Sequence, residues 1–338
     1  MTQKNTPTPP TVPIPLNLLE DERLLAAAAK KLNIKVEPID QSTGLNMFSR
    51  AGRRFFVWRH IVDLNSYVAS AVANNKAILK RLLVREGIRT APGFTEKNPN
   101  RALERVHQGD LSYPLVVKPI DGSGGVAVTV DIRDDATMLR GIEEVFKFNR
   151  RTKGKPNSFL VEAFVPGDDY RFVVLDGRVL TVLLRKPAYV IGDGRSSIGR
   201  LIDLYNAQPG VEPTLPLNPI VRDLELQRHL SLQNLAEHSV VGRGVRVVLR
   251  KNANVSTGGR SFECTDRVHE DYKKLAVRIA RLLELRFCAV DLLAPDIRRF
   301  EKFAVLEVNT RPGLDVHEKP YRGRAFALTE TLLRAMFR

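Results

Sequence analysis

The chain has 338 residues, a formal net charge of +15 at pH 7 and a hydrophobic content of 43%. This length suits two or three subdomains better than one small core. No apolar run approaches the roughly 20 residues that span a bilayer, and the Pro-rich start, residues 1–15, lacks the apolar region of a signal peptide. The two cysteines have no CxxC spacing, so neither a disulfide framework nor a zinc site is supported. We therefore expect a cytoplasmic protein with a disordered tail and no membrane association.

Elements in the first half of the chain follow from hydrophobic spacing and turn residues. Residues 19–33 have helical composition, residues 34–40 resemble a strand, and residues 53–61 a second strand or hairpin. A single helix is predicted from Ser66 to Arg85, ending near Gly87. Two strands flank a glycine turn within residues 113–132, a helix is predicted over 134–149, and residues 158–165 return to strand.

In the second half, a hairpin around Asp176 and Gly177 is predicted over residues 170–186. Amphipathic helices are predicted over 223–238 and 266–284, the latter with Thr265 or Asp266 as its N-cap. Strands 286–294 and 303–310 follow, and a last helix begins at about Ala325. Hairpins with intervening helices indicate an α+β organisation with a βα piece at the N-terminus.

The strands near the C-terminus carry polar side chains at positions that should be buried. Asp291 lies in the apolar segment FCAVDLLA, where an unpaired carboxylate would cost several kcal/mol without a compensating cation. Glu307 and Asn309 share one face of their strand because side chains alternate with period 2. An antiparallel pairing would bring these three residues together as oxygen ligands of the kind that Mg²⁺ prefers. The alternative is a pair of strand carboxylates neutralised by Lys or Arg.

The glycine-rich turn DGSGG, residues 121–125, could present backbone N–H groups to an anion. Lys118 leaves the strand just before this turn, where it could meet a phosphate, although the turn lacks the spacing of a P-loop. A structural hairpin turn is the alternative. Lys76 lies on an amphipathic helix, where most lysines are solvated.

Two further segments are candidates for ligand binding. Glu162 and, seven positions later, Asp169 could form part of a nucleotide-binding site at the end of a strand. Alternatively, this segment is a strand that leads into a polar loop. Residues 249–266 combine small hydroxyl residues, two glycines and arginines that could bind an oxyanion, or they could form a mobile surface loop. The histidines are scattered and no GxSxG or HExxH occurs, so serine-hydrolase and zinc-protease chemistry have no support. His317 is a candidate substrate contact or a packed histidine.

The basic excess would suit a polyanionic partner, but it also suits an enzyme that handles nucleotide phosphates and carboxylates. The basic residues are spread along the chain, and their densest cluster, residues 147–155, resembles a solvated loop. We therefore do not expect nucleic acid to be the primary partner.

Taken in order, seven segments resemble the ATP-grasp superfamily of carboxylate–amine ligases. The likeness is greatest to the ATP-grasp part of cyanophycin synthetase and of fused glutathione synthetases, and it extends from roughly residue 24 to 320. Each segment is modest alone, and the series is strong. The segments are NNKAILKRLLVREGIRTAPG, LVVKPIDGSGG, VEAFVPGDDYRFVVLDGRV, YVIGDGRSSIGRLID, LRKNANVSTGG, AVDLL and LEVNTRPGLDVH.

The resemblance implies an ATP-grasp fold, in which two α+β subdomains enclose ATP after a small α/β N-terminal domain. The implied divisions are a tail at 1–15, an N-terminal domain at 16–75, a central subdomain at 76–165 and a C-terminal subdomain at 166–338.

The resemblance also implies roles for individual residues. Metal ligands for two Mg²⁺ ions, which Mn²⁺ could replace, would be Asp291, Glu307 and Asn309. Nucleotide contacts would come from Lys76, Lys118, the loop residues Gly122, Ser123, Gly124 and Gly125, then Glu162, Phe164, Val165 and Asp169. The γ-phosphate and acyl group would lie among Arg171, Arg185, Arg250, Ser256, Gly258 and Arg260. Several superfamily members carry an arginine where this chain has Ala289, so Arg250 or Arg260 would have to supply that charge.

The implied activity is ADP-forming: a carboxylate attacks the γ-phosphate of ATP to give an acylphosphate, which an amine then displaces. Amino acids or short peptides are the expected substrates, and a homodimer is one expected state. A chain of this length would lack the Mur-ligase-like half of cyanophycin synthetase, so we expect a single coupling and not polymer synthesis. Two alternatives are a non-catalytic ATP-binding protein and a ligase that adds amino acids to a ribosomal or other protein.

Overall fold

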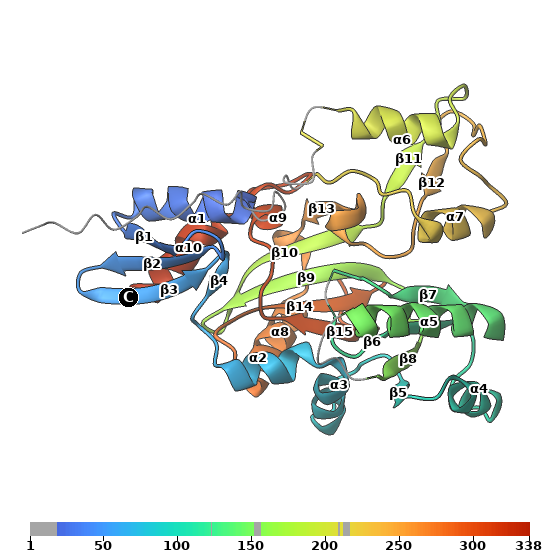
Figure 1. Cartoon of the computed structure of the whole chain (residues 1–338), viewed down its shortest axis with the longest axis horizontal. Helices are drawn as coiled ribbons and strands as arrows, with labels where there is room; N and C mark the ends of the chain where they lie inside the picture. The colour runs from blue at the N-terminus through green and yellow to red at the C-terminus, as the bar shows by residue number, and fades with distance from the viewer. Residues whose placement is uncertain (1–18, 123, 152–156, 209, 212–216) are drawn as a thin grey trace, which may run out of the picture.

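The computed structural model describes residues 19–122, 124–151, 157–208, 210–211 and 217–338 (Figure 1). The predicted tail and Ser123 lie outside these residues. The described part contains helices and antiparallel sheets in alternation, which confirms the α+β class. No helix in that part is long and apolar enough to cross a bilayer.

The N-terminal unit is a helix on an antiparallel sheet. α1 (Leu19–Lys31) precedes β1 (Lys35–Asp40), β2 (Leu45–Arg50), β3 (Arg53–Trp58) and β4 (Ile61–Val62), which pair in chain order. The unit shares its apolar core with the last helix, α10 (Leu328–Met336), through residues such as Leu25 and Leu332. Figure 1 shows α10 and the C-terminus beside this sheet. The two ends of the described chain therefore build one core.

A second sheet is formed by the central part of the chain. β5 (Gly93–Glu96), β8 (Phe159–Ala163), β6 (Leu115–Pro119) and β7 (Thr129–Ile132) lie in this spatial order, and α4 (Pro99–His107) and α5 (Asp135–Arg151) complete the unit. Val117 and Val161 point into its apolar core with α5. Because strand side chains alternate, Lys118 and Glu162 lie on the opposite face.

The largest sheet has five antiparallel strands in the order β13 (Arg260–Glu263), β10 (Arg178–Lys186), β9 (Asp168–Leu175), β14 (Phe287–Ala294) and β15 (Ala304–Asn309). Asp176 and Gly177 both have positive φ angles in the turn between β9 and β10, as a tight hairpin requires. One face of the sheet packs on α2 (Tyr67–Asn74), α3 (Lys76–Arg85) and α8 (Glu270–Leu282).

A smaller unit is inserted between β10 and β13, with its own apolar core. It contains β11 (Tyr189–Ile191), α6 (Ile198–Asn206), α7 (Leu224–Ser231) and β12 (Arg246–Val248), and lies at the end of the molecule away from β1 (Figure 1). Two short 3-10 helices, Val255–Thr257 and Thr265–Arg267, and α9 (Asp315–Glu318) follow.

Three local predictions were wrong. The helix predicted from Ser66 to Arg85 is two helices, because the Asn75 side chain accepts hydrogen bonds from the N–H groups of Ala77 and Ile78 and caps α3. The helix predicted over 223–238 ends at Ser231.

The third concerns the start of α8, which begins at Glu270 with His269 as its N-cap. The Thr265 hydroxyl instead accepts from the Val182 N–H at 2.8 Å, which ties it to the large sheet. The predicted divisions 75/76 and 165/166 fall at Asn75 and between β8 and β9, and they stay predictions.

Candidate active site

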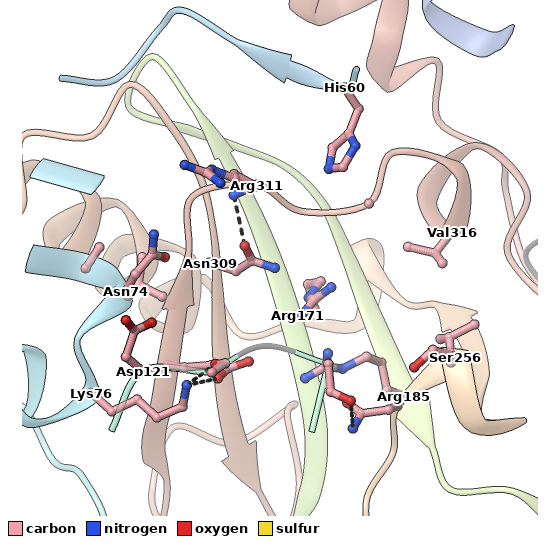
Figure 2. Close-up of a pocket in the computed structure, with 18 of the residues that line it drawn as sticks. His60, Asn74, Lys76, Asp121, Arg171, Arg185, Ser256, Asn309, Arg311 and Val316 are labelled. Atoms are coloured by element: carbon pink, nitrogen blue, oxygen red, sulfur yellow. Dashed lines mark hydrogen bonds and ion pairs between the residues drawn. The ribbon is translucent and has the colours of Figure 1, made fainter. Parts of the chain in front are cut away.

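A cavity of about 720 Å³ lies between the large sheet, the α2–α3 junction and the loop after β6 (Figure 2). Two clusters of residues line it. Towards β6 and β10 the lining includes Lys76, Gly122, Gly124, Arg171, Arg185, Ser256, Glu307 and Asn309. Towards the N-terminal unit it includes His60, Arg311, Gly313 and Val316, and Asn74 lies beside Asp121 near Lys76.

Strand register places the charged residues on one face. Asp291 of β14 lies opposite Arg171 of β9 on one side and Glu307 of β15 on the other. A bulge in the β14–β15 pairing next to Asp291 allows this alignment. Asn309 lies opposite Ala289, two residues from Asp291 and so on the same face. The convergence predicted for Asp291, Glu307 and Asn309 is thus present.

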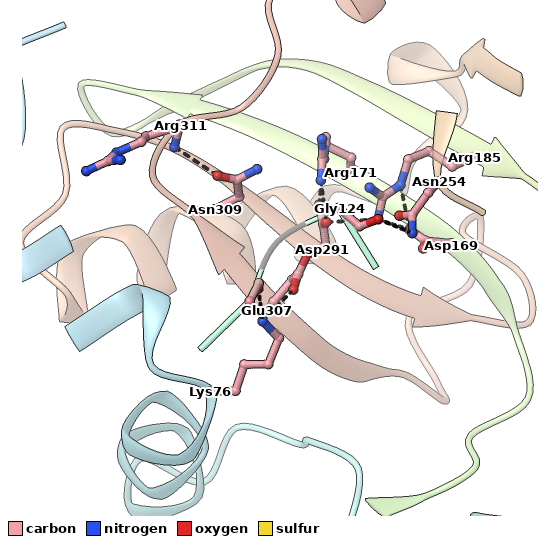
Figure 3. A network of polar contacts seen from close by, with 11 residues as sticks. Lys76, Gly124, Asp169, Arg171, Arg185, Asn254, Asp291, Glu307, Asn309 and Arg311 are labelled. Carbon is pink, nitrogen blue, oxygen red and sulfur yellow. Dashed lines mark hydrogen bonds and ion pairs between the residues drawn. The ribbon is translucent and has the colours of Figure 1, made fainter. Parts of the chain in front are cut away.

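Asp291 is fully buried and bound by two arginines (Figure 3). Arg171 donates to both carboxylate oxygens, at 2.9 and 2.7 Å, and Arg185 donates to one of them at 2.8 Å. Arg185 also donates to Asp169 at 2.6 Å. Burial alone would raise the pKa of Asp291, but the two guanidinium groups outweigh it and hold the pKa at about 2. This chain has Ala289 where several superfamily members carry an arginine. The positive charge next to Asp291 comes from Arg171 and Arg185.

Glu307 and Asn309 face the cavity more openly. Glu307 is 32% exposed and lies 3.3 Å from the Lys76 ammonium, which also donates to the Gly122 carbonyl at 2.6 Å. The Asn309 side-chain oxygen accepts from the Arg311 N–H at 2.9 Å. Two carboxylates directly opposite each other repel, and the neighbouring cations offset that repulsion.

The oxygen donors fit a magnesium ion that completes its shell with phosphates and water. Glu307 and Asn309 offer a carboxylate and a carboxamide to the cavity, and both are hard oxygen ligands. Asp291 lies beside them, and it would exchange an arginine contact to become a ligand. Within the described ranges, no three His, Cys, Asp or Glu side chains form a metal cluster by themselves. The protein by itself would therefore provide only part of the coordination shell of a magnesium ion.

The predicted nucleotide contacts lie partly outside this cavity. Lys118 and Glu162 are buried and paired at 2.5 Å. The Phe164 N–H donates to the Pro114 carbonyl, and the Asp169 carboxylate faces Arg185. None of these residues, nor Val165, lines the cavity as the structure describes it.

The two predicted loops meet across the cavity. The Asn254 side chain donates to the Gly124 carbonyl at 3.0 Å. Gly125 has a φ of +70°, and a Cβ there would lie 1.8 Å from the Asn254 amide nitrogen, so only glycine permits this contact. Ser256 lines the cavity, whereas Gly258 packs against Ile220.

Arg250 and Arg260 are not part of the cavity wall. Arg250 donates to the Asp223 carboxylate at 2.8 Å and to the Val221 carbonyl at 2.7 Å. The Arg260 guanidinium is buried among the rings of Tyr189, Tyr205 and Tyr321. The structure therefore brings Arg171 and Arg185 to the charged face of the large sheet. Arg250 and Arg260 lie in the inserted unit and at its border.

Several cavity residues had no clear sequence signal. His60 and Arg311 reach the site from the turn between β3 and β4 and from the turn after β15, and no local pattern marks them. Asn74 and Asn75 could have been noticed, since paired asparagines inside a helical pattern favour a new N-cap. His317 is fully buried, and burial lowers its pKa to about 3. It is a neutral, packed residue behind the cavity.

A pair of acids lies behind the cavity lining. The Asp21 carboxylate accepts from the N–H groups of Leu314 and Asp315, at 3.0 and 2.8 Å, and is 3.8 Å from His60. Burial, with repulsion from Glu318 and Glu20, raises the pKa of Asp21 to about 6, and burial, with repulsion from Asp21, raises that of Asp315 to about 7. The pair opposes folding when both members are ionised.

Asp315→Asn is therefore expected to raise the Tm at pH 8.5 by roughly 3 °C. The pKa of Asp315 is raised in the folded state, so protonated Asp315 contributes its full stability below about pH 4. This contribution is lost as the pH rises through 7. Asn keeps the acceptor for the Val316 N–H and removes the charge that faces Asp21 and Glu20. Thermal melts at pH 8.5 and 5 check this, since the gain should shrink at pH 5. An equal gain at both values would contradict the charge explanation.

Comparison with known proteins identifies the family of the chain. The RimK-like ATP-grasp domain model matches residues 237–327, which include Asp291, Glu307 and Asn309. The glutathione biosynthesis bifunctional protein GshAB of Desulfotalea psychrophila is 30% identical over 331 residues, covering 94% of this chain and 41% of that protein. The GshAB protein of Mannheimia succiniciproducens is 32% identical over 291 residues, covering 81% of this chain and 36% of that protein.

A solved structure agrees. The crystal structure of a bifunctional glutathione synthetase from Pasteurella multocida superposes with a TM-score of 0.65 at 27% identity, over 94% of this chain and 44% of that one. The chain thus spans about two fifths of the length of the curated relatives it matches. The matching fold, the matched domain and the relatives across nearly the whole chain show that this protein belongs to the ATP-grasp superfamily.

Proposed function

We propose that the chain is an ADP-forming carboxylate–amine ligase that couples amino acids or a short peptide through an acylphosphate. The observation that carries this proposal is the cavity wall on which Lys76, Arg171 and Arg185 lie beside the oxygen donors Glu307 and Asn309. Fixed cations and oxygen ligands on one rigid sheet can hold a triphosphate and stabilise charge that develops during phosphoryl transfer. The relatives are named for glutathione biosynthesis, which supports a peptide-forming reaction.

Each group on the wall has a proposed task. Arg171 and Arg185 would hold the γ-phosphate and the acyl group in line. The two reacting groups would then need to move little before they react. Magnesium, held by Glu307, Asn309 and Asp291, would neutralise phosphate oxygens during transfer. Lys76 would bind a phosphate in place of its present contact with the Gly122 carbonyl. The protein supplies no covalent nucleophile in this scheme.

The nucleotide would extend from this wall towards β6 and β8. Lys118 would contact a phosphate, and the strand end at Glu162, Phe164 and Val165 would hold adenine. Because the Phe164 N–H is used by Pro114, we expect the Val165 backbone to make the main adenine contact. Asp169 would reach a ribose only by giving up its bond to Arg185.

The other end of the cavity would accept the substrates. Arg311 is exposed and lines the cavity, and its guanidinium can bind a carboxylate in a bidentate manner. His60 adds a polar group on the same side. This chemistry suits amino acids and peptides, which carry a carboxylate besides the one that is activated.

A phosphate-release screen over pairs of amino acids and dipeptides, with ATP and Mg²⁺, tests the proposal. We expect release only with a matching pair, together with a product whose mass equals the sum of the pair minus water. ATP binding without phosphate release on any pair would indicate a non-catalytic binding protein. A mass increase on a ribosomal or other protein, with no coupling of free amino acids, would indicate a macromolecular acceptor.

A further inference from the structure

A buried triad of charges lies next to the proposed phosphate site. The Glu162 carboxylate receives Lys80 on one oxygen at 2.6 Å and Lys118 on the other at 2.5 Å. The three side chains are 14% exposed or less. Burial alone would raise the pKa of Glu162, but the two ammonium groups outweigh it and keep the carboxyl ionised.

Lys80 differs from Lys118 in how completely it is bound. A lysine ammonium has three N–H donors, and that of Lys80 meets three acceptors: Glu162, the Thr90 hydroxyl at 3.1 Å and the Ala91 carbonyl. Across the described chain, the Lys118 ammonium pairs with the Glu162 carboxylate alone. Lys80 is therefore saturated by the protein, whereas Lys118 keeps donors for another group.

The backbone makes room for this triad. Gly93 of β5 lies opposite Glu162 of β8, and a Cβ at Gly93 would lie 2.8 Å from the Glu162 Cγ and 2.5 Å from the Val161 carbonyl oxygen. Lys80 is one helical turn after Lys76 on α3, so both project from the same side of the helix. The helix thus sends Lys76 to Glu307 and Lys80 to Glu162.

We propose that Lys80 is a positioning residue for nucleotide binding, which acts through Glu162 on Lys118. Two lysines and one glutamate leave the triad with a net charge of +1. Without Lys80, Glu162 and Lys118 would form a neutral pair, and Lys118 would attract phosphate less. The inference rests on the proposed function, because it takes ATP as the ligand.

The test measures the binding of Mg²⁺ with AMP-PNP, a non-hydrolysable ATP analogue, to the full chain by calorimetry. Lys80→Met should weaken binding about tenfold, because the net charge next to the phosphates is lost. Lys80→Arg keeps the net charge of +1 and should retain most of the affinity. Arg81→Met, at an exposed position of the same helix, is the matched control and should bind as the wild type does.

Lys80→Arg separates charge from packing, because it keeps the positive charge but changes the shape of the side chain. If Lys80 acted through packing alone, Lys80→Arg would bind as weakly as Lys80→Met, and that result would overturn the inference. Should Lys80→Met not fold, Lys80→Gln makes the same charge change while keeping a donor for the Ala91 carbonyl. Equal affinity of wild type and Lys80→Met would overturn the inference alone. A wild type that does not bind AMP-PNP would refute the proposed function itself.

Discussion

Glu307→Gln is expected to lower substrate-dependent phosphate release roughly 10³-fold or more, mainly in kcat. The carboxylate of Glu307 faces the cavity, and Gln keeps its shape but not its charge. A divalent ion would then lose an anionic ligand at the point where phosphate charge develops. Steady-state kinetics with the pair identified by the screen would measure the loss.

The fold of this variant should be intact. Glu307 lies directly opposite Asp291, and removing one of two facing carboxylates relieves repulsion within the sheet. Circular dichroism and Tm should therefore match the wild type or exceed it slightly. Glu301→Gln, at an exposed position between β14 and β15, is the control and should keep full activity. Full activity in Glu307→Gln would refute the metal assignment.

Asp291→Asn is expected to lower the free energy of unfolding by about 3–5 kcal/mol. The Asp291 carboxylate is fully buried and compensates two guanidinium groups, one of them on the buried Arg185. Asn has the same size but no charge, so Arg171 would lose its carboxylate partner and Arg185 would keep Asp169 alone of its two ion pairs. Urea unfolding monitored by fluorescence would measure the change, and ligase activity should be lost as well.

Asp296→Asn provides a control on the same hairpin. Asp296 is also bonded to an arginine, Arg298, and its pKa is held at about 2, but the pair is exposed to solvent. Its removal should leave the urea midpoint nearly unchanged, because water replaces the lost partner. If both variants lost the same stability, burial of Asp291 would not be the cause.

Local patterns predicted much of the site. Period-2 alternation in residues 303–310 placed Glu307 and Asn309 on one face, and β15 confirms that they share it. The Asp176–Gly177 hairpin was predicted for the same kind of reason, because two positive φ angles are a local requirement. The break at Asn75 was missed, although its capping chemistry is local, because the apolar spacing continues through it.

Partnerships between distant residues could not be predicted. Arg171 and Asp291 are 120 residues apart, and nothing near either of them indicates which cation compensates the buried acid. Arg250 was an equally reasonable choice from composition, yet it binds Asp223. No local pattern distinguishes Lys80 from other lysines of an amphipathic helix, and its partners, Thr90 and Ala91 before β5 and Glu162 of β8, meet it only in the fold.

The sequence by itself determined which side chains share a face, where turns occur and which residue types could bind metal and phosphate, since these depend on backbone periodicity and local chemistry. Only the tertiary structure decided which charges pair, that α10 completes the N-terminal core and that Lys80 and Lys118 share the Glu162 carboxylate. Pairing depends on distance in space, and the long-range strand contacts that set these distances are fixed only when the whole chain packs.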